Sequence, residues 1–407
     1  MIKVGCDIVE ISRFSQMKNL DAFIKKVFTK RESEYFAASK NPHESIAGAF
    51  AAKEAFSKYA GSGFRGFGFH DIELLHDEIN KPYLLFMGKK INADVSISHS
   101  NTEAIAVVCG EGLMFGNDKF ELWKSYRAFL PKRHDNMHKG DCGKVLVVAG
   151  STGLVGAACL TSRAAMRSGS GLVTLALPEC ILTSAAAQLC EVMTMPLPCH
   201  DGHISGNAKT IITDRLREFD VCAIGPGIRA CRDTFEIVSS VLSCTVPCVI
   251  DADGLNALSS DTSVLKNKNC KTVITPHPGE MARLMGCSIE DVENNREKAA
   301  LDFASEYDTV VVLKGHKTVV AAPNGELHIN PTGNDGMASG GMGDVLTGII
   351  ASFIGQGTEP FGAAILGTFL HGLSGDIAAD EIGKFGLLAS DVIDKLPYVI
   401  KNLADNI

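Results

Sequence analysis

The sequence has thirteen cysteines but no CxxC pair, and its closest spacing, Cys244 to Cys248, is interrupted by Pro247. Zinc sites and disulfide frameworks use regularly spaced cysteines, so these thiols are expected to be reduced. No apolar run approaches the roughly 18 to 20 residues that a membrane span needs. Asp7 and Glu10 also interrupt the region where a signal peptide would be basic and then apolar. The sequence therefore predicts a cytoplasmic protein without a membrane partner.

The chain also lacks an excess of positive charge. The net charge of the 407 residues is −8, and residues 1–115 contain 14 Lys and Arg against 14 Asp and Glu, so the acidity belongs to the remainder. This balance argues against nucleic acid as a general partner. Internal repeats and low-complexity tracts are lacking too, and a chain of this length with 45% apolar residues can form two or more domains.

The hydrophobic pattern changes partway along the chain. Residues 1–112 mix short strands with helices, which predicts an α+β domain, and 113–137 have the poor periodicity of a linker. From 138 to 407, apolar runs alternate with helical stretches, which is typical of an α/β domain with a mainly parallel sheet covered by helices on both faces. Strands are expected at 2–6, 71–75, 83–86, 94–98, 104–108, 145–149, 172–176, 221–224, 246–250, 272–274 and 310–313, and helices at 20–40 and 44–59.

A glycine-rich stretch before an apolar helical pattern is the most informative motif. Gly340, Gly341 and Gly343 leave backbone N–H groups uncovered at a helix start, where the helix dipole adds partial positive charge, so they predict an anion hole. Asp344 follows, and a carboxylate beside such a hole can take a proton from a hydroxyl group while a phosphoryl group is held nearby. The stretch therefore predicts phosphate-linked chemistry rather than a simple helix cap.

Further motifs follow the expected strands of the α/β domain, at the strand ends where open sheets bind ligands. Residues 150–157 form a small-residue loop that suits a phosphate or dinucleotide, although a tight strand–helix turn needs glycine as well. Asp251 and Asp253 could hold Mg²⁺ or cap the next helix. His277 lies between two prolines in a rigid loop and is expected to contact a ligand. Residues 314–318 offer cations and N–H groups to a nucleotide phosphate.

Together these motifs resemble the NAD(P)H-hydrate dehydratases of the ribokinase-like superfamily. The resemblance covers about 138–403 and rests on the order of segments 138–141, 150–157, 225–227, 275–280, 314–318, 330–334 and 340–344. It implies that a hydrated, damaged nicotinamide cofactor is dehydrated to NADH or NADPH at the expense of ADP or ATP. It assigns the adenine nucleotide to Lys314, Gly315, His316, Lys317, Thr318 and Gly343, and NAD(P)H hydrate to Ala157, Gly227, His277 and Asp344.

In the mechanism expected from these assignments, Asp344 activates the hydroxyl group of the hydrated ring and the nucleotide phosphorylates it. Phosphate then leaves as the double bond returns. Two alternatives stay open. A small-molecule kinase would use a glycine-rich loop ending in aspartate equally well, although 150–157 and 275–280 favour the dehydratase. One half of the chain could instead be a degenerate module kept for binding or oligomerisation.

Two carboxylates of the first domain are candidate Mg²⁺ ligands. Asp7 is expected at the end of the opening strand and Glu54 on a helix, and Mg²⁺ commonly takes one or two carboxylates together with substrate phosphate and water. Spacing alone makes this pair a weak signal, because exposed acids are common. Lys53 and Lys58 flank Glu54 and could reach a phosphate, or they could belong to a solvated helix face.

The surrounding segments resemble the holo-acyl-carrier-protein synthases over nearly all of residues 1–109. The resemblance rests on segments 5–14, 28–32, 47–55, 61–63 and 96–100. It implies transfer of the 4′-phosphopantetheine arm of coenzyme A to a serine of acyl carrier protein, which leaves 3′,5′-ADP. It also implies Mg²⁺ bound by Asp7 and Glu54, catalytic roles for Glu54 and Lys58, contacts of Lys53, Ser98 and His99 with coenzyme A, and a homo-oligomer, since this family usually forms trimers with shared sites.

A locally basic segment supports the carrier-protein partner. Residues 11–40 contain seven Lys and Arg against three acidic residues, within a domain that is otherwise neutral. Carrier proteins are acidic, so electrostatic steering would speed their encounter with this segment. Arg13 and Lys25 are the expected docking residues, although a charged run is more often a solvated helix face.

Overall fold

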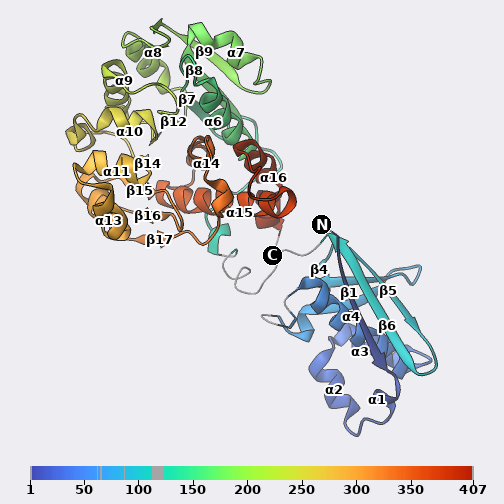
Figure 1. Ribbon diagram of the computed structural model, residues 1–407. Helices are drawn as coiled ribbons and strands as arrows, with labels where there is room; N and C mark the ends of the chain where they lie inside the picture. The colour runs from blue at the N-terminus through green and yellow to red at the C-terminus, as the bar shows by residue number, and fades with distance from the viewer. Residues whose placement is uncertain are drawn as a thin grey trace. The chain divides into compact units, whose positions relative to one another are not determined.

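The computed structural model describes residues 2–61, 63–64, 67–86, 88–111, 123 and 125–405. The chain forms two compact units that divide between Ser125 and Tyr126 (Figure 1). This boundary falls inside 113–137, the expected linker, of which 113–122 and 124 lie outside the described residues. From Tyr126 onward the segment belongs to the second unit, since the Phe129 carbonyl oxygen accepts a hydrogen bond from Thr358.

Two small antiparallel sheets and several helices make up the described part of the first unit, which confirms its predicted α+β class. The longest helix packs against the larger sheet and buries an alanine-rich face in the core. The larger sheet pairs β1 (Ile2–Glu10), β6 (Glu103–Glu111) and β5 (Ala93–His99) in that order, and the smaller pairs β2 (Ile72–His76), β3 (Pro82–Phe86) and β4 (Lys89–Lys90). The helices are α1 (Ser12–Ser15), α2 (Leu20–Val27), α3 (Lys30–Ala38) and α4 (Pro42–Ala60).

The single helix expected over 20–40 is two helices, α2 and α3. Phe28 is extended between them, and Thr29 caps α3 by accepting from the Glu32 N–H, while the Glu32 side chain accepts from the Thr29 N–H. This reciprocal pair is a capping box. A helix start signal therefore lies inside a stretch whose apolar periodicity is nearly continuous.

A glycine allows β1 and α4 to touch. A Cβ on Gly5 would lie 2.0 Å from the Ala55 carbonyl oxygen and 2.4 Å from the Tyr59 nitrogen, so a larger residue does not fit. Asp7 follows two residues later and therefore shares this helix-facing side of the strand. It lies within β1 rather than at its end, because β1 pairs with β6 as far as Glu10. The close contact positions Asp7 next to α4.

A nine-stranded sheet forms the centre of the second unit (Figure 1). Seven neighbouring strands are parallel, and the two at one edge are antiparallel, which confirms the predicted α/β class with a mainly parallel sheet. The order is β17 (Leu327–Ile329), β16 (Val319–Ala321), β15 (Val310–Leu313), β14 (Thr272–Ile274), β13 (Cys248–Ile250), β12 (Val221–Ile224), β7 (Lys144–Val148), β8 (Leu172–Pro178) and β9 (Met193–Leu197).

Helices cover both faces of this sheet, as the sequence predicts. On one face they pack on one another and on the central strands, and on the other they enclose a large apolar core. The first layer comprises α6 (Val155–Arg167), α14 (Met342–Gly355), α15 (Pro360–Ile382) and α16 (Ala389–Asp405). The second comprises α8 (Ala208–Leu216), α9 (Arg232–Leu242), α10 (Asp253–Leu258), α11 (Pro278–Met285), α12 (Ile289–Asn294) and α13 (Arg296–Tyr307).

One helix among the described residues, α15, is long and apolar enough to cross a membrane by length and composition, although the sequence was expected to contain no such run. Its most apolar window has a mean hydropathy of 1.2, and 78% of that window is buried within the structure. Buried core helices commonly meet the same criterion. The packing of α15 against α14 and α16 therefore accounts for its composition.

Candidate active sites

The glycine-rich stretch and Asp344 lie at the first turn of α14. Gly341 precedes the helix and has a left-handed backbone with φ of 91°, which favours glycine. Met342 and Gly343 begin the helix, and N–H groups at this position have no intrahelical acceptor. The structure thus places the predicted anion hole at a helix N-terminus, and anion binding there stays a prediction.

A buried ion pair lies beside this helix start. Lys314 Nζ is 2.6 Å from Asp251 Oδ1 and 3.8 Å from Glu280 Oε2, and the Thr347 hydroxyl donates to Asp251 Oδ2 at 2.8 Å. Burial alone would lower the pKa of Lys314, but the Asp251 and Glu280 carboxylates outweigh it and leave the pKa raised. Lys314 therefore carries a positive charge that is fixed inside the site.

Asp251 and Asp253, considered for Mg²⁺ or for a helix cap, both have protein partners in the structure. Asp251 is engaged by Lys314, and Asp253 Oδ2 accepts the Arg229 N–H at 3.0 Å. Ala252 precedes α10 and makes no side-chain cap. Within the part of the chain that the structure describes, no group of three or more His, Cys, Asp or Glu is arranged to hold a metal ion.

Asp344 has the titration behaviour of a general base. Burial and repulsion from Asp251 raise its pKa to about 7, while Lys314 acts in the opposite direction. A carboxylate that ionises near neutral pH combines availability with basicity. Gly343 precedes it and faces Lys314, because an added Cβ would lie 3.2 Å from Lys314 Nζ. The absence of a side chain keeps this ammonium next to the helix start.

His277 has a structural role and an accessible ring. Its Nδ1 accepts from the N–H groups of Gly279 and Glu280, at 3.0 and 3.3 Å, and Glu280 accepts from the His277 N–H at 2.8 Å. These bonds cap α11. Burial lowers the pKa of His277, as do the nearby charges of Lys314 and Arg283, so the ring is neutral near pH 7. Since 51% of the side chain is exposed, it can also meet a ligand.

Ala157 and Gly227, both predicted to bind NAD(P)H hydrate, lie against one another where two neighbouring strands end. A Cβ on Gly227 would lie 3.1 Å from the Ala157 Cβ, and Gly227 has φ of 63°. The Ser151 hydroxyl donates to the Gly227 carbonyl oxygen at 2.8 Å, and the Gly150 N–H donates to Pro226 at 2.9 Å. The structure therefore pairs Ala157 with Gly227, while His277 and Asp344 lie around the Lys314 cluster.

A cavity of about 470 Å³ adjoins the start of α14. The residues between β15 and β16 form one wall, and α15 contributes to another. Gly315 adopts φ of 148° there, beside the Arg296 guanidinium group. The cavity is lined by every residue predicted to bind the nucleotide, namely Lys314, Gly315, His316, Lys317, Thr318 and Gly343.

Two further cavity residues were not assigned from the sequence. Asn330 is 4% exposed and donates to the Thr332 and Thr368 carbonyl oxygens, both at 3.1 Å. Burial lowers the pKa of His371 to about 4, so its imidazole is neutral. Its Nε2 is buried and has no partner among the described residues. The available signal was a lone histidine within a very apolar helix, which usually indicates core packing.

Asp7, Glu54 and Lys58 converge in the first unit, because Glu54 and Lys58 are four residues apart on one face of α4. Lys58 Nζ lies 2.8 Å from Asp7 Oδ1 and donates to the Cys6 carbonyl oxygen at 2.9 Å. Burial and repulsion from Asp7 raise the pKa of Glu54, whereas Lys58 and Arg13 act in the opposite direction. Two carboxylates that repel one another are suited to sharing a cation.

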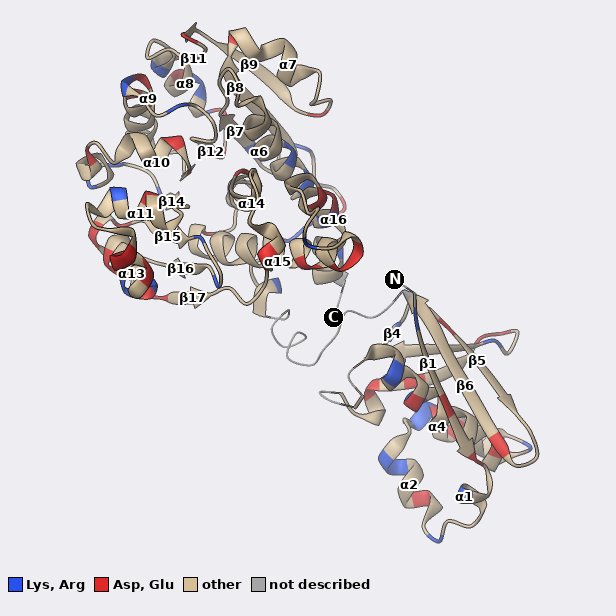
Figure 2. Cartoon of the chain, viewed as in Figure 1, with Lys and Arg blue, Asp and Glu red and all other residues tan. Residues whose placement is uncertain are grey.

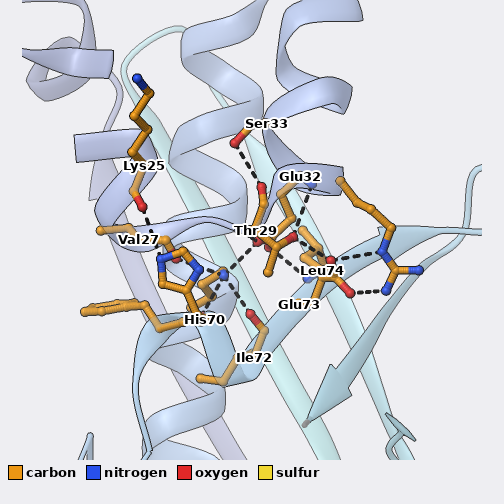
Figure 3. Close-up of polar contacts among 12 residues, drawn as sticks. Lys25, Val27, Thr29, Glu32, Ser33, His70, Ile72, Glu73 and Leu74 are labelled. Carbon is orange, nitrogen blue, oxygen red and sulfur yellow. Dashed lines mark hydrogen bonds and ion pairs between the residues drawn. The ribbon is translucent and has the colours of Figure 1, made fainter. Parts of the chain in front are cut away.

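The structure contradicts the expectation that Lys53 contacts coenzyme A. Its amino group is buried and donates to Glu32 Oε2 at 2.8 Å and to the carbonyl oxygens of Val27, Phe69 and Ile72 at 3.1, 2.8 and 2.6 Å. Three of these partners, Glu32, Val27 and Ile72, are labelled in Figure 3. Adjacent helical residues point about 100° apart, so Lys53 faces the core while Glu54 faces the site.

Ser98 and His99 point to opposite faces of β5. Asp7 and Ile97 both pair with Ala106, so these three residues share one face of the sheet. Ser98, the next residue after Ile97, lies on the opposite face, and within one chain it is therefore not next to Asp7. His99 lines a separate cavity of about 430 Å³ between β5 and α4, with Lys40, Asn41 and Glu44. Its Nδ1 is 3.9 Å from Glu44 Oε2. Of the pair, only His99 lines this cavity.

Arg13 and Lys25 are both exposed, as docking residues must be. The Arg13 guanidinium group lies 5.4 Å from the centre of the Phe50 ring. Lys25 is on α2, where basic and acidic positions are mixed (Figure 2). Its backbone oxygen accepts from His70, and Figure 3 shows the side chain extending away from the network. Docking stays a prediction.

A cavity at the carboxyl edge of a parallel sheet, beside a base and a helix N-terminus, is typical of enzymes that transfer phosphoryl groups. Residues 145–398, more than half of the chain, match the family model described as NAD(P)H-hydrate dehydratase, and the protein belongs to this family. Residues 3–109 match the model of the 4′-phosphopantetheinyl transferase superfamily. The chain therefore joins domains of two enzyme families, which confirms the predicted fusion.

Similar proteins match the second unit. The bifunctional NAD(P)H-hydrate repair enzyme Nnr of Moorella thermoacetica is 47% identical over 283 residues, which are 69% of this chain and 53% of that protein. The ADP-dependent (S)-NAD(P)H-hydrate dehydratase of Bacillus subtilis is 35% identical over 70% of this chain and 99% of its own. A crystal structure of the ADP/ATP-dependent NAD(P)H-hydrate dehydratase from Bacillus subtilis, co-crystallised with ATP/Mg²⁺, has a TM-score of 0.61 and 33% identity, over 69% of this chain and 97% of that one. The chain spans about half the length of the Nnr relative.

Proposed function

We propose that the second unit dehydrates NAD(P)H hydrate to NAD(P)H at the expense of ADP or ATP. The observation that carries this proposal is Asp344, whose pKa of about 7 is combined with a position at the start of α14. The adjoining cavity supplies Lys314 and the other predicted nucleotide contacts. The family membership and the ADP-dependent relative support the same chemistry.

In the proposed reaction, Asp344 takes the proton from the hydroxyl group on the hydrated ring. The resulting oxygen attacks the terminal phosphorus of the nucleotide, and the bond to the leaving nucleotide phosphate breaks. The N–H groups at the start of α14 stabilise the transferring phosphoryl group, a contribution of roughly 3 kcal/mol for each donor in comparable sites. The carbon–oxygen bond then breaks and phosphate leaves, and the adjacent ring carbon loses a proton to water as the ring double bond returns.

The test is recovery of dihydronicotinamide absorbance from hydrated NADH with ADP, ATP or neither. Full-length protein is compared with Asp344→Asn and with Asp302→Asn, a control at an exposed position on α13. We expect recovery that requires a nucleotide and Asp344 but not Asp302. Full turnover by Asp344→Asn would rule out the proposed role of Asp344. If absorbance does not recover with either nucleotide, the kinase alternative is favoured.

We propose that the first unit transfers 4′-phosphopantetheine from coenzyme A to a serine of acyl carrier protein. Asp7 and Glu54 supply the hard oxygen ligands that Mg²⁺ prefers, and burial together with repulsion from Asp7 raises the pKa of Glu54. Mg²⁺, when bound, would neutralise the phosphates of coenzyme A. Lys58 pairs with Asp7 and offers a half-exposed cation, while the cavity beside His99 is proposed to take the nucleotide end of coenzyme A.

Intact-mass measurement of an apo acyl carrier protein, incubated with full-length protein, coenzyme A and Mg²⁺, tests this activity. We expect the added phosphopantetheine to depend on Asp7 and Glu54, and Glu78→Gln to serve as a control at an exposed turn. Charge reversal at Arg13 and Lys25 should slow the reaction most at low salt. Modification by Asp7→Asn at the wild-type rate would argue against the metal site.

A homo-oligomer is also proposed, because the sheet of the first unit exposes an apolar face. Val4, Ile8 and Ile105 are 60%, 57% and 38% exposed, and Ile8 pairs directly with Ile105. Exposed apolar faces of this kind are commonly covered by association. Light scattering should give a mass above that of one chain, and Ile8→Glu should lower it. Ile79→Glu, at a turn where Ile79 is 83% exposed, is the matched control.

A further inference from the structure

Two cysteines meet at the carboxyl edge of the sheet, beside the loop 150–157. Strands β8 and β9 are parallel, and Pro178 pairs with Leu197 at their ends. Cys180 and Cys199 each follow these paired residues by two positions, Cys180 in the 3₁₀-helix Glu179–Ile181 and Cys199 at the start of the next short strand. The Cys180 side chain raises the pKa of the Cys199 thiol, so the two groups are close enough to interact. The fold therefore places the two cysteines beside one another at neighbouring strand ends.

These thiols are accessible, unlike the other close pair. Cys180 is exposed and Cys199 is partly exposed. Cys248 and Cys270 have Sγ atoms 3.7 Å apart but are 0% and 7% exposed, and they lie within the core. Because oxidation depends on access to the sulfur as well as on thiolate formation, the Cys180–Cys199 pair is the one that a dissolved oxidant reaches.

Both cysteines belong to segments that hold Thr152. Cys180 Sγ lies 3.9 Å from Thr152 Oγ1. On the other side, the Thr152 N–H donates to the Gly202 carbonyl oxygen at 2.8 Å, in the turn of the hairpin formed by β10 (Cys199–His200) and β11 (His203–Ile204). Thr152 lies in the loop that leads to Ala157. A bond that draws the two segments together therefore acts on this loop from both sides.

We propose that Cys180 and Cys199 form a reversible disulfide that displaces the loop 150–157 and slows the dehydratase reaction. The effect on rate rests on the proposed function, whereas the disulfide does not. With hydrogen peroxide as oxidant, one thiolate attacks a peroxide oxygen, the O–O bond breaks, and hydroxide leaves and is protonated to water. The second thiolate then attacks the sulfenic sulfur, the S–S bond forms and a second water leaves. Two thiols are thus oxidised by two electrons, and one peroxide is reduced to two waters.

The disulfide is tested on full-length protein by titration with hydrogen peroxide, blocking of free thiols and peptide mass spectrometry. We expect a linked peptide containing Cys180 and Cys199 that disappears after dithiothreitol. Cys248 and Cys270 should remain free for alkylation after unfolding. The matched control is Cys190, an exposed cysteine outside the pair. Oxidation of Cys190 without the linked peptide would overturn the proposal.

The effect on the site is tested by the rate of NADH recovery before and after oxidation. We expect oxidised wild type to lose about tenfold in kcat/KM for the hydrated cofactor, since small displacements of positioning groups cost at least this much, and to regain it with dithiothreitol. Cys180→Ser and Cys199→Ser should resist peroxide, while Cys190→Ser should behave as wild type. Equal inactivation of Cys180→Ser, or a complete disulfide with an unchanged rate, would overturn the coupling. If neither the reduced nor the oxidised chain has dehydratase activity, the proposed function is wrong. The linked peptide would still show whether the disulfide forms.

Discussion

Lys314 lies 2.6 Å from Asp251, and this buried pair sets the charge balance of the candidate dehydratase site. Glu280 lies 3.8 Å from the same ammonium group, and Asp344 also feels its field. Burial and the neighbouring carboxylates outweigh the one cation, Lys314, and keep Asp344 protonated up to about neutral pH. Burial in this cluster of charges therefore makes Asp344 suited to act as a base.

Replacement of Lys314 by methionine should destabilise the second unit. Asp251 is 1% exposed and would lose the ammonium group that compensates its charge. We expect a loss of about 3 kcal/mol in the free energy of unfolding, at the low end for a broken buried pair because part of the lysine is exposed. Urea denaturation measures it, and Lys317→Met, at an exposed position of the same cavity, is the control. Equal stability of the two variants would contradict a stabilising pair.

The pH dependence of the dehydratase should report Asp344. Its pKa is about 7, and only the ionised form can accept the substrate proton. We expect kcat/KM for the hydrated cofactor to rise about tenfold per pH unit below this value and to level off above it. A profile that is flat from pH 5 to 8 would assign the proton transfer to another group. The residual activity of Asp344→Asn should not show this rise with pH.

Stability should show the opposite dependence on pH. The folded pKa of Asp344, about 7, lies above the ordinary value of 3.8, so the folded chain holds a proton that the unfolded chain releases. Stability from this group is therefore present at low pH and lost as pH rises towards 7. Asp344→Asn cannot ionise, and we expect it to be more stable than wild type at pH 8 by about 1 to 3 kcal/mol. Equal thermal stability at pH 8 would contradict the raised pKa.

The sequence predicted the central strands well because parallel strands buried on both faces are continuous apolar runs. The runs at 221–224, 272–274 and 310–313 coincide with β12, β14 and β15. The edge strands β9 and β17 were missed because short strands with mixed burial carry little periodicity, and β16, although buried, was missed because it has only three residues. The break between α2 and α3 was missed although Thr29 and Glu32 have the capping-box spacing, because the apolar pattern around them suggested one helix.

Strand-end motifs located the second site, but the charges that tune it could not be derived from sequence. The nucleotide residues are mostly contiguous in the chain and line one cavity. By contrast, the pKa of Asp344 depends on Asp251, nearly a hundred residues away, and on burial that only the fold creates. The roles of Lys53 and Lys58 differ for the same reason. Both flank Glu54, but only the packing of α4 decides which of them faces the core.

Lys53 and Lys58 should therefore give opposite phenotypes. Lys53→Met leaves Glu32, which is 1% exposed, without its buried cation, and we expect a loss of about 3 to 5 kcal/mol in the free energy of unfolding of the first unit. Lys58→Met should unfold like wild type, because 53% of its side chain is exposed, but should transfer phosphopantetheine more slowly. Chemical denaturation and carrier-protein mass shifts measure the two effects. A stable, inactive Lys53→Met would restore a role at coenzyme A.

Two glycines of the α14 start offer a matched test of the nucleotide site. A Cβ on Gly343 would lie 3.2 Å from Lys314 Nζ, whereas one on Gly340 would meet nothing within 4 Å. Both alanine variants keep their backbone N–H groups, so a difference between them isolates the space beside the ammonium. We expect Gly343→Ala to raise the nucleotide KM by about tenfold, a cost near 1.4 kcal/mol, and Gly340→Ala to leave it unchanged. Equal effects at both positions would indicate that helix-start flexibility, rather than the approach to Lys314, controls nucleotide binding.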